Sequence, residues 1–300
     1  VRVDEPLGPM TTYRVGGAAA IFACPTSIAD LHELAAVIAK YDLPVLVVGR
    51  GSNLLVADAG FAGVALSLAS WTDGIEITGV DVESGSAVAL PVLARRTAAS
   101  GLTGFEWAVG VPGSLGGAIR MNAGGHGSDI AASLVRAEIF DLHTQQCGWR
   151  PAVALGLRFR GSDLLDHEIV LTAHLTLATG DVEQSEHEIA EIVHWRRENQ
   201  PGGQNAGSVF VNPIPGELSA GQLIDRLGLR GYRVGGAFVS DKHANFIQAG
   251  DGATAADVKA VMDDVRARVA RETGFVLRSE VRLVGFVDAD TATSEGSSNG

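Results

Sequence analysis

The sequence predicts an α+β protein with more than one domain, and three observations support this prediction. Helical apolar spacing recurs in segments that start at a capping residue, most clearly over residues 254–272. Short β-branched or alternating runs, such as residues 44–48 and 80–85, indicate strands between the helices. A chain of 300 residues is also long enough for two domains, and 46% hydrophobic against 19% charged residues indicates a globular, soluble protein.

The first half of the chain predicts a helix, a buried strand, further strands and a second helix, in that order. Residues 27–41 carry apolar side chains at helical spacing behind Ser27, which is a suitable N-cap. Residues 44–48 predict the buried strand, residues 80–85 alternate as a strand does, and residues 87–100 predict a helix that ends at a glycine.

The second half predicts two long strands and three helices. The strands cover residues 134–142 and 168–177, and a turn that begins at residue 178 closes the first α+β unit. Helices are expected over residues 182–197, 219–228 and 254–272. We expect the last helix to pack on a strand at residues 275–284. Residues 288–300 contain no apolar anchor and predict a disordered tail.

Two glycine-rich turns are candidate binding elements. Residues 104–127 contain eight glycines among 24 residues, and glycine lets backbone N–H groups approach a phosphate closely. The spacing matches neither a Rossmann turn nor a P-loop, so composition alone supports a structural turn cluster and an anion site about equally. A second turn, residues 49–53, follows the strand at residues 44–48. Two such turns favour one ligand that is held at both ends.

Charge and cysteine content limit the partners. The formal net charge of −12 disfavours nucleic acid and anionic membranes. Cys24 and Cys147 form no disulfide framework, and no apolar stretch is long enough for a signal peptide or a membrane span, so we expect a cytoplasmic protein. His187 begins a zinc-helix pattern, but Glu191 stands where the second histidine is required, so no metal is expected.

Three polar residues in the second half are candidates for catalysis, although each has a simpler explanation. Arg160 precedes Gly-Ser, Ser208 follows a glycine, and Glu280 lies close to apolar residues near the end of the chain. An arginine or glutamate of this kind usually faces solvent, and such a serine usually forms a turn. The serines beside glycines also lack the G-x-S-x-G context of a hydrolase nucleophile. Pattern alone therefore makes these three residues candidates and no more.

A series of motifs nevertheless resembles one family along nearly the whole chain. The motifs are Thr-Tyr-Arg-Val-Gly-Gly at 12–17, Gly-Arg-Gly-Ser-Asn at 49–53, Gly-Val-Pro-Gly-Ser-Leu-Gly-Gly at 110–117, Asn-Ala-Gly at 122–124, Asn-Ala-Gly-Ser-Val-Phe at 205–210 with Asn-Pro at 212–213, His-Ala-Asn-Phe at 243–246 and Ser-Glu-Val-Arg at 279–282. In this order they resemble the UDP-N-acetylenolpyruvoylglucosamine reductase (MurB) family, and the resemblance covers roughly residues 8–286.

The resemblance implies a fold and an activity. An FAD-binding region of the vanillyl-alcohol-oxidase (PCMH) type, made of two α+β subdomains that split near residue 60, would cover residues 8–178. A C-terminal α+β substrate-binding domain would cover residues 179–287. The resemblance further implies non-covalent FAD, NADPH as electron source and a nucleotide-sugar substrate. The product would be UDP-N-acetylmuramate for peptidoglycan synthesis, and we expect a monomer.

The family's catalytic residues fall on the three candidates. Its arginine corresponds to Arg160, its proton-donating serine to Ser208 and its late glutamate to Glu280. In the implied reaction flavin N5 delivers a hydride to C3 of the enolpyruvyl group, and Ser208 protonates C2. Arg160 would receive the charge that develops on the carboxylate, and a protonated Glu280 would donate to it. Arg158 is a rival to Arg160, because in an extended segment the two would share a face.

Cofactor and substrate contacts also carry over from the family. FAD contacts are expected at Gly49, Arg50, Gly51, Ser52, Asn53, Gly113, Ser114, Gly117, Ala118 and Gly124. Substrate contacts are expected at Asn212, Gln222 and Asn245. The alternative for Asn245 is a turn side chain that bonds nearby backbone. Val211 and Asn199 stand where relatives carry lysine, and Phe159 stands where many carry tyrosine.

Two other functions fit the same cofactor region. One is another FAD-linked oxidase or dehydrogenase, and the other is a flavin-binding or nucleotide-sugar-binding protein without turnover. The joint presence of Arg160, Ser208 and Glu280 favours the reductase over both. NADPH consumption with and without the enolpyruvyl substrate would separate the three.

Overall fold

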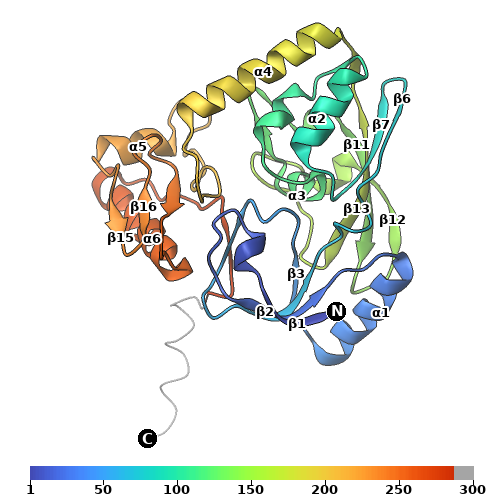
Figure 1. Cartoon of the computed structure of the whole chain (residues 1–300), viewed down its shortest axis with the longest axis horizontal. Helices are drawn as coiled ribbons and strands as arrows, with labels where there is room; N and C mark the ends of the chain where they lie inside the picture. Colours follow the sequence, from blue (N-terminus) through green and yellow to red (C-terminus); the bar gives the residue numbers. More distant parts are fainter. Residues whose placement is uncertain (287–300) are drawn as a thin grey trace, which may run out of the picture.

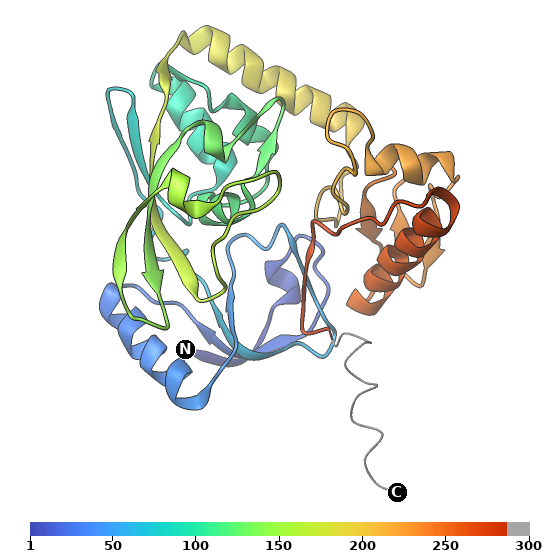
Figure 2. The same cartoon turned by 180° about the vertical axis from the view of Figure 1, so that it is seen from behind.

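The computed structural model describes residues 1–286, which form three lobes, with one long helix between the second and the third (Figures 1 and 2). We call residues 1–66 the first lobe, residues 67–181 the second lobe and residues 200–281 the third lobe. The long helix α4 (Val182–Asn199) runs from the second lobe to the third. The tail predicted over residues 288–300 lies outside the described residues.

The first lobe is a four-stranded sheet with one helix. Its strand order is β1-β2-β5-β3, with β1 antiparallel to β2 and the other neighbours parallel. The elements are β1 (Arg2–Pro6), η1 (Gly8–Met10), β2 (Ala18–Ala23), α1 (Ile28–Tyr41), β3 (Val45–Val47), β4 (Leu54–Val56) and β5 (Phe61–Leu66). Helix α1 begins where predicted, because Ser27 Oγ accepts a hydrogen bond from the Asp30 backbone N–H at 3.1 Å. Since β5 completes this sheet, the lobe extends past the split expected near residue 60.

The second lobe is built on a five-stranded antiparallel sheet of order β12-β11-β13-β7-β6. Its strands are β6 (Ile75–Thr78), β7 (Asp81–Gly85), β11 (Leu134–Asp141), β12 (Cys147–Pro151) and β13 (Glu168–Thr176). The strands predicted at residues 80–85, 134–142 and 168–177 are thereby confirmed. Its other elements are α2 (Leu90–Ala99), β8 (Leu102–Thr103), η2 (Glu106–Gly110), α3 (Leu115–Met121), β9 (Gly124–Gly125), β10 (Ser128–Asp129), η3 (Ile130–Ala132), η4 (Ala152–Leu155) and β14 (Ala178–Thr179).

The glycine-rich stretch holds more regular structure than its composition suggests. It contains η2 and the seven-residue helix α3, which packs against β13 and β7. The apolar residues between the glycines explain this order, because Leu115, Ala118 and Ile119 are buried in the core of the second lobe. The helix ends at Asn122, whose φ of 39° places it in the left-handed region.

The third lobe is a small three-stranded sheet with two helices. Its elements are α5 (Ala220–Arg226), β15 (Arg233–Val234), β16 (Ala237–Val239), β17 (Ile247–Ala249) and α6 (Ala255–Thr273), followed by β18 (Arg282–Val284). Thr254 and Asp257 form the predicted capping box of α6. Helix α6 packs on β15, β16 and β17, and Leu277 and Val281 after it are buried in the same core. The segment expected to be one strand over residues 275–284 is a strand only at β18. Strand β18 returns to the first lobe and pairs in parallel with β4.

The cores show how the lobes are joined. Ile189 and Ile192 of α4 are buried with the core of the second lobe, so this helix packs with that lobe. The domain boundary expected at residue 178 stays a prediction. The core of the third lobe includes Tyr13 and Leu55 from the first lobe, both fully buried. Burial raises the pKa of the Tyr13 phenol far above its ordinary value. The third lobe is therefore completed by residues from the start of the chain.

Candidate active site

The two glycine turns lie against each other, as a shared ligand requires. A Cβ added to Gly49 would overlap Ser114 Oγ, and one added to Gly113 would lie 3.5 Å from Ser52 Oγ. Gly51 has a φ of 61°, and a Cβ there would overlap the Met10 carbonyl. The turn after β3 and the turn before α3 therefore lie side by side, with no room for a side chain at Gly49 or Gly51.

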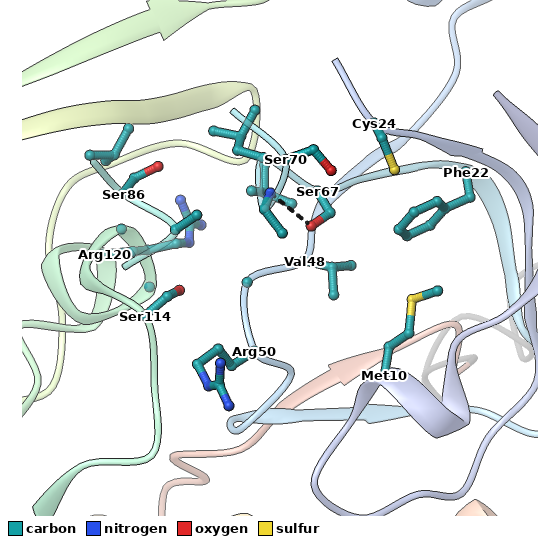
Figure 3. Close-up of a pocket in the computed structure, with 18 of the residues that line it drawn as sticks. Met10, Phe22, Cys24, Val48, Arg50, Ser67, Ser70, Ser86, Ser114 and Arg120 are labelled. Carbon is teal, nitrogen blue, oxygen red and sulfur yellow. Dashed lines mark hydrogen bonds between the residues drawn. The ribbon is translucent and has the colours of Figure 1, made fainter. Parts of the chain in front are cut away.

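A cavity of about 560 Å³ opens along these turns. Gly49, Arg50, Ser114 and Gly117 line it, together with Arg120 of α3, which the sequence analysis did not single out. Figure 3 shows Arg120, Ser86 and Ser114 on one side of this pocket and Met10, Phe22 and Val48 on the other. The pocket thus joins exposed glycine backbone and four arginines, Arg2, Arg50, Arg120 and Arg282, to an apolar wall. This combination fits the diphosphate and a ring of a dinucleotide.

The remaining FAD candidates lie in the first glycine turn, in the second-lobe core and at strand β9. Gly51, Ser52 and Asn53 belong to the first turn, where Asn53 Nδ2 donates to the Glu280 carbonyl at 2.9 Å. Ala118 is buried in the second-lobe core. Gly124 does not line the cavity, and its requirement for glycine has a local reason. A Cβ there would lie against Ser128 and Asp129 of the facing strand β10.

Arg160 and Glu280 face each other across the boundary between the second and third lobes. Arg160 Nε lies 3.5 Å from Glu280 Oε2, and the two side chains are only 25% and 18% exposed. Arg160 has a φ of 56°, and its buried Nε makes no hydrogen bond to the described residues. Burial raises the pKa of the Glu280 carboxyl, while the charges of Arg160 and Arg278 lower it. The Nε–H donor of Arg160 therefore has no hydrogen-bond partner within residues 1–286. It lies beside the Glu280 carboxyl, which burial keeps protonated to higher pH.

The rival Arg158 has a different environment. Its side chain is 60% exposed, and its Nη1 donates to Asp163 and to the Gly156 carbonyl. The backbones of Arg158 and Gly161 form a tight pair of hydrogen bonds, so residues 158–161 turn rather than extend. Arg158 and Arg160 consequently do not share a face, and Arg160 is the one beside Glu280.

Ser208 lies next to the strand-like contact that holds Glu280. The Glu280 N–H donates to the Val209 carbonyl at 2.8 Å, and Phe210 forms a bridge with Ser279. Ser208 itself is half-buried, and Gly207 before it has a φ of 77°. The fold therefore brings Ser208 into the neighbourhood of Glu280, although the two are 72 positions apart in the chain.

The three expected substrate contacts are engaged in the local fold. Asn212 Oδ1 accepts from the Ala220 N–H at 3.1 Å, and Gln222 forms a capping box with Ser219, so both serve the start of α5. Asn245 is buried, and its amide both accepts from the Phe210 N–H and donates to the Phe210 carbonyl. Both groups of the Asn245 amide therefore hold the segment after Ser208, and the expected substrate contact at Asn245 stays a prediction.

Arg196 of α4 is a partly buried arginine near His126, outside the set of residues that line the cavity. Burial lowers the pKa of its guanidinium, yet no carboxylate among the described residues lies within ion-pair distance. Its charge also helps burial to lower the pKa of His126, whose ring meets the Trp195 ring edge-on at 5.2 Å. An arginine in a polar helix gives no signal of this in the sequence, because most such residues face solvent.

Residues 1–286 contain neither a metal-binding cluster nor a membrane-spanning helix. That part of the chain holds no cluster of three or more His, Cys, Asp or Glu residues placed to bind a metal ion. His187 and Glu191 form an exposed pair at 3.2 Å within α4. None of the helices in the described chain combines the length and the apolar character that a membrane crossing requires.

Comparison with known proteins agrees with this geometry. The model of the C-terminal domain of UDP-N-acetylenolpyruvoylglucosamine reductase matches residues 199–284, and a model of an FAD binding domain matches residues 19–143. The reductase of Heliobacterium modesticaldum is 43% identical over 284 residues, covering 94% of this chain and 90% of that protein. The reductase of Bacillus subtilis is 37% identical over 289 residues, covering 95% and 94%.

A solved structure gives the same result in three dimensions. The crystal structure of the reductase (MurB) from Thermus caldophilus superposes with a TM-score of 0.82 at 33% identity, covering 94% of this chain and 99% of that one. The match to the C-terminal model begins at the last residue of α4, in agreement with the core assignment of that helix. The chain belongs to the UDP-N-acetylenolpyruvoylglucosamine reductase family of FAD-linked oxidoreductases.

Proposed function

We propose that this chain reduces UDP-N-acetylglucosamine enolpyruvate to UDP-N-acetylmuramate, with NADPH as electron source, as a monomer in the bacterial cytoplasm. Family membership supports the reductase activity and FAD as its cofactor. The Arg160–Glu280 pair is the main structural support for assigning catalytic roles to residues of this chain. It lies between two lobes and is attached to the glycine turn at residues 49–53 through Asn53.

The glycine turns would hold the diphosphate of FAD. Their backbones are exposed at Gly49 and Gly117, and Arg50 and Arg120 line the same cavity with positive charge. When bound and reduced, FAD supplies the hydride that adds to C3 of the enolpyruvyl group. The protein must then stabilise the negative charge that this addition moves toward the carboxylate.

Arg160 and Glu280 are suited to that task. The buried Nε of Arg160 and the rest of its guanidinium offer a charged donor fork to the substrate carboxylate. Glu280, whose pKa burial raises, would donate a proton in a hydrogen bond to the same carboxylate. Ser208 would then give its proton to C2 and recover one from solvent through a relay. The sum of these steps adds one hydride and one proton across the double bond.

The test uses the purified holoprotein and the enolpyruvyl substrate. We expect a flavin spectrum, flavin reduction by NADPH, and NADPH consumption that continues only when the substrate is present. Glu280→Gln and Arg160→Lys should each slow reoxidation of the flavin by substrate. A holoprotein that consumes NADPH at the same rate with and without the substrate would contradict the proposal.

A further inference from the structure

A three-residue ionic bridge connects the cofactor cavity to both sides of the Arg160–Glu280 pair. One oxygen of Asp166 accepts from Arg120 Nη2, and the other accepts from Arg282 Nη2 at 2.5 Å. We call these three residues the Asp166 bridge. Arg120 belongs to α3, Asp166 to the loop before β13, and Arg282 to β18, so the bridge joins three segments that are remote in the sequence. All three residues line the cofactor cavity.

On one side, the bridge fixes the loop that carries Arg160. Arg120 Nη1 donates to the carbonyls of Leu164 and Leu165, at 2.9 and 2.8 Å. The carbonyl of Arg120 accepts from Ser162 Oγ at 2.6 Å. Ser162 is two residues after Arg160, whose left-handed backbone needs support from its neighbours. A single residue of α3 therefore holds this loop at three points.

On the other side, the bridge fixes the segment that carries Glu280. Arg282, two residues further on, donates its backbone N–H to the Asn53 carbonyl at 2.9 Å. Asn53 in turn donates to the Glu280 carbonyl. The Arg282 side chain then reaches Asp166. The backbone contacts therefore tie this segment to the first lobe, and the side-chain contact ties it to the second lobe. Without Asp166, the contact from this segment to the Arg160 loop would be reduced to the Arg160–Glu280 pair itself.

The exposure of the bridge indicates that it contributes to geometry more than to stability. The Asp166 side chain is 58% exposed, and ion pairs at such positions stabilise a fold by only about 0–1 kcal/mol. Arg120 and Arg282 lie close together because they bind the two oxygens of one carboxylate. Burial lowers the pKa of the Arg120 guanidinium, and the charge of Arg282 adds to this effect. The Asp166 carboxylate binds both guanidinium groups and offsets their mutual repulsion, and the charge of Glu168 adds to this effect at Arg120.

We propose that Asp166 is a positioning residue, which holds the Arg160 loop and the Glu280 segment in register by binding Arg120 and Arg282 at once. This inference rests on the roles proposed above for Arg160 and Glu280. Misplacement of reacting groups by about 1 Å can cost about 10²-fold in rate. The bridge would thus act on the substrate half-reaction from outside the reacting groups.

The first test compares Asp166→Asn with Asp163→Asn in the full-length holoprotein. Asparagine keeps one acceptor oxygen, so Asp166→Asn can hold only one of the two arginines. Asp163 is an exposed carboxylate of the same loop that pairs with Arg158, so it is a control matched in charge and exposure. We expect Asp166→Asn to slow reoxidation by the enolpyruvyl substrate roughly 10- to 100-fold, with flavin content and reduction by NADPH near wild type. Asp163→Asn should leave all three unchanged, and equal rates for the two variants would overturn the proposal.

The pH profile separates a positioning role from a general defect. The charged groups facing Glu280 are Arg160 and Arg278, and both lower its pKa. If Asp166→Asn lets Arg160 move away, the pKa of Glu280 rises, and the alkaline limb of the reoxidation rate moves to higher pH. Loss of the Asp166 charge alone would lower that pKa. An upward shift therefore reports separation of the pair, and an unchanged or lowered limb would count against it.

Hydrogen exchange provides a readout that does not depend on turnover. The N–H groups of Glu280 and Arg282 are both bonded in the structure, so their exchange reports whether this segment stays in place. We expect Asp166→Asn to accelerate exchange over residues 279–284, and Asp163→Asn to leave that segment unchanged. If the wild-type protein fails to reduce the enolpyruvyl substrate, the proposed function fails, while this comparison still decides the bridge. Unchanged exchange at residues 279–284 in Asp166→Asn would refute it.

Discussion

Replacement of Arg160 by lysine keeps a positive charge and removes the planar pair of donors. In the structure Arg160 Nε is buried without a hydrogen bond and lies 3.5 Å from the carboxylate of Glu280. A single ammonium group cannot face Glu280 and also present two directed donors to a substrate carboxylate. We therefore expect a loss of about 2.7–4 kcal/mol in transition-state stabilisation, which corresponds to roughly 10²- to 10³-fold in rate.

The matched control is Arg158→Lys. Arg158 is 60% exposed and pairs with Asp163, an interaction worth about 0–1 kcal/mol, so its replacement should leave the rate near wild type. The assay is anaerobic stopped-flow absorbance of the flavin, with NADPH reduction and substrate reoxidation recorded separately. The Arg160→Lys defect should appear mainly in reoxidation. A larger defect in Arg158→Lys, or equal slowing of both half-reactions in Arg160→Lys, would refute the assignment.

Four further results are expected. Ser208→Ala should leave flavin reduction by NADPH nearly intact and slow reoxidation by about 10²-fold or more, and equal slowing of both steps would show damage to the site rather than loss of a proton donor. The pKa of Glu280 is raised by burial and its protonated form is the donor, so reoxidation should decline as pH rises through that pKa, and this alkaline limb should be absent in Glu280→Gln. Acid precipitation should release the flavin into the supernatant, whereas colour in the pellet would mean a covalent bond. Gly51→Ala should lower the free energy of unfolding by more than about 1 kcal/mol and reduce flavin content, because φ at Gly51 is 61° and the new Cβ would overlap the Met10 carbonyl. Gly74 has open space around it, so Gly74→Ala should change neither quantity. Thermal unfolding and flavin assays of both variants check this.

Local features of the fold could be predicted from the sequence because their causes lie within a few residues. The starts of α1 and α6 follow from a capping side chain and the N–H three residues later. The three predicted strands of the second lobe follow from their apolar pattern. The fate of residues 275–284 could not be predicted in the same way, since only β18 is a strand and its partner is β4, more than 220 positions earlier. Nothing in the local pattern specifies a partner at that distance.

In the candidate site, too, the features set by local sequence could be predicted and those set by long-range contacts could not. The glycine turns could be identified from composition, and Arg160 could be named from its motif. The choice between Arg160 and Arg158 depended on a tight turn at residues 158–161, which places the two side chains in different surroundings. The use of Asn245 to hold Phe210, and the position of Arg120 in the cavity along the glycine turns, depend on tertiary contacts. Such roles leave no spacing signal, because the residues involved meet only after folding.

The burial of Tyr13 and Leu55 in the third-lobe core limits how the gene for this enzyme can recombine with the genes of its relatives. The C-terminal domain looks like a contiguous cassette in the sequence, yet its packing is completed by two residues near the start of the chain and by the pairing of β18 with β4. A recombination event that imported residues 199–284 from another species would bring a foreign core against the resident Tyr13 and Leu55. Compatibility of such a hybrid would be decided at positions outside the transferred gene segment, so productive crossovers should be those that carry the first lobe along with the last.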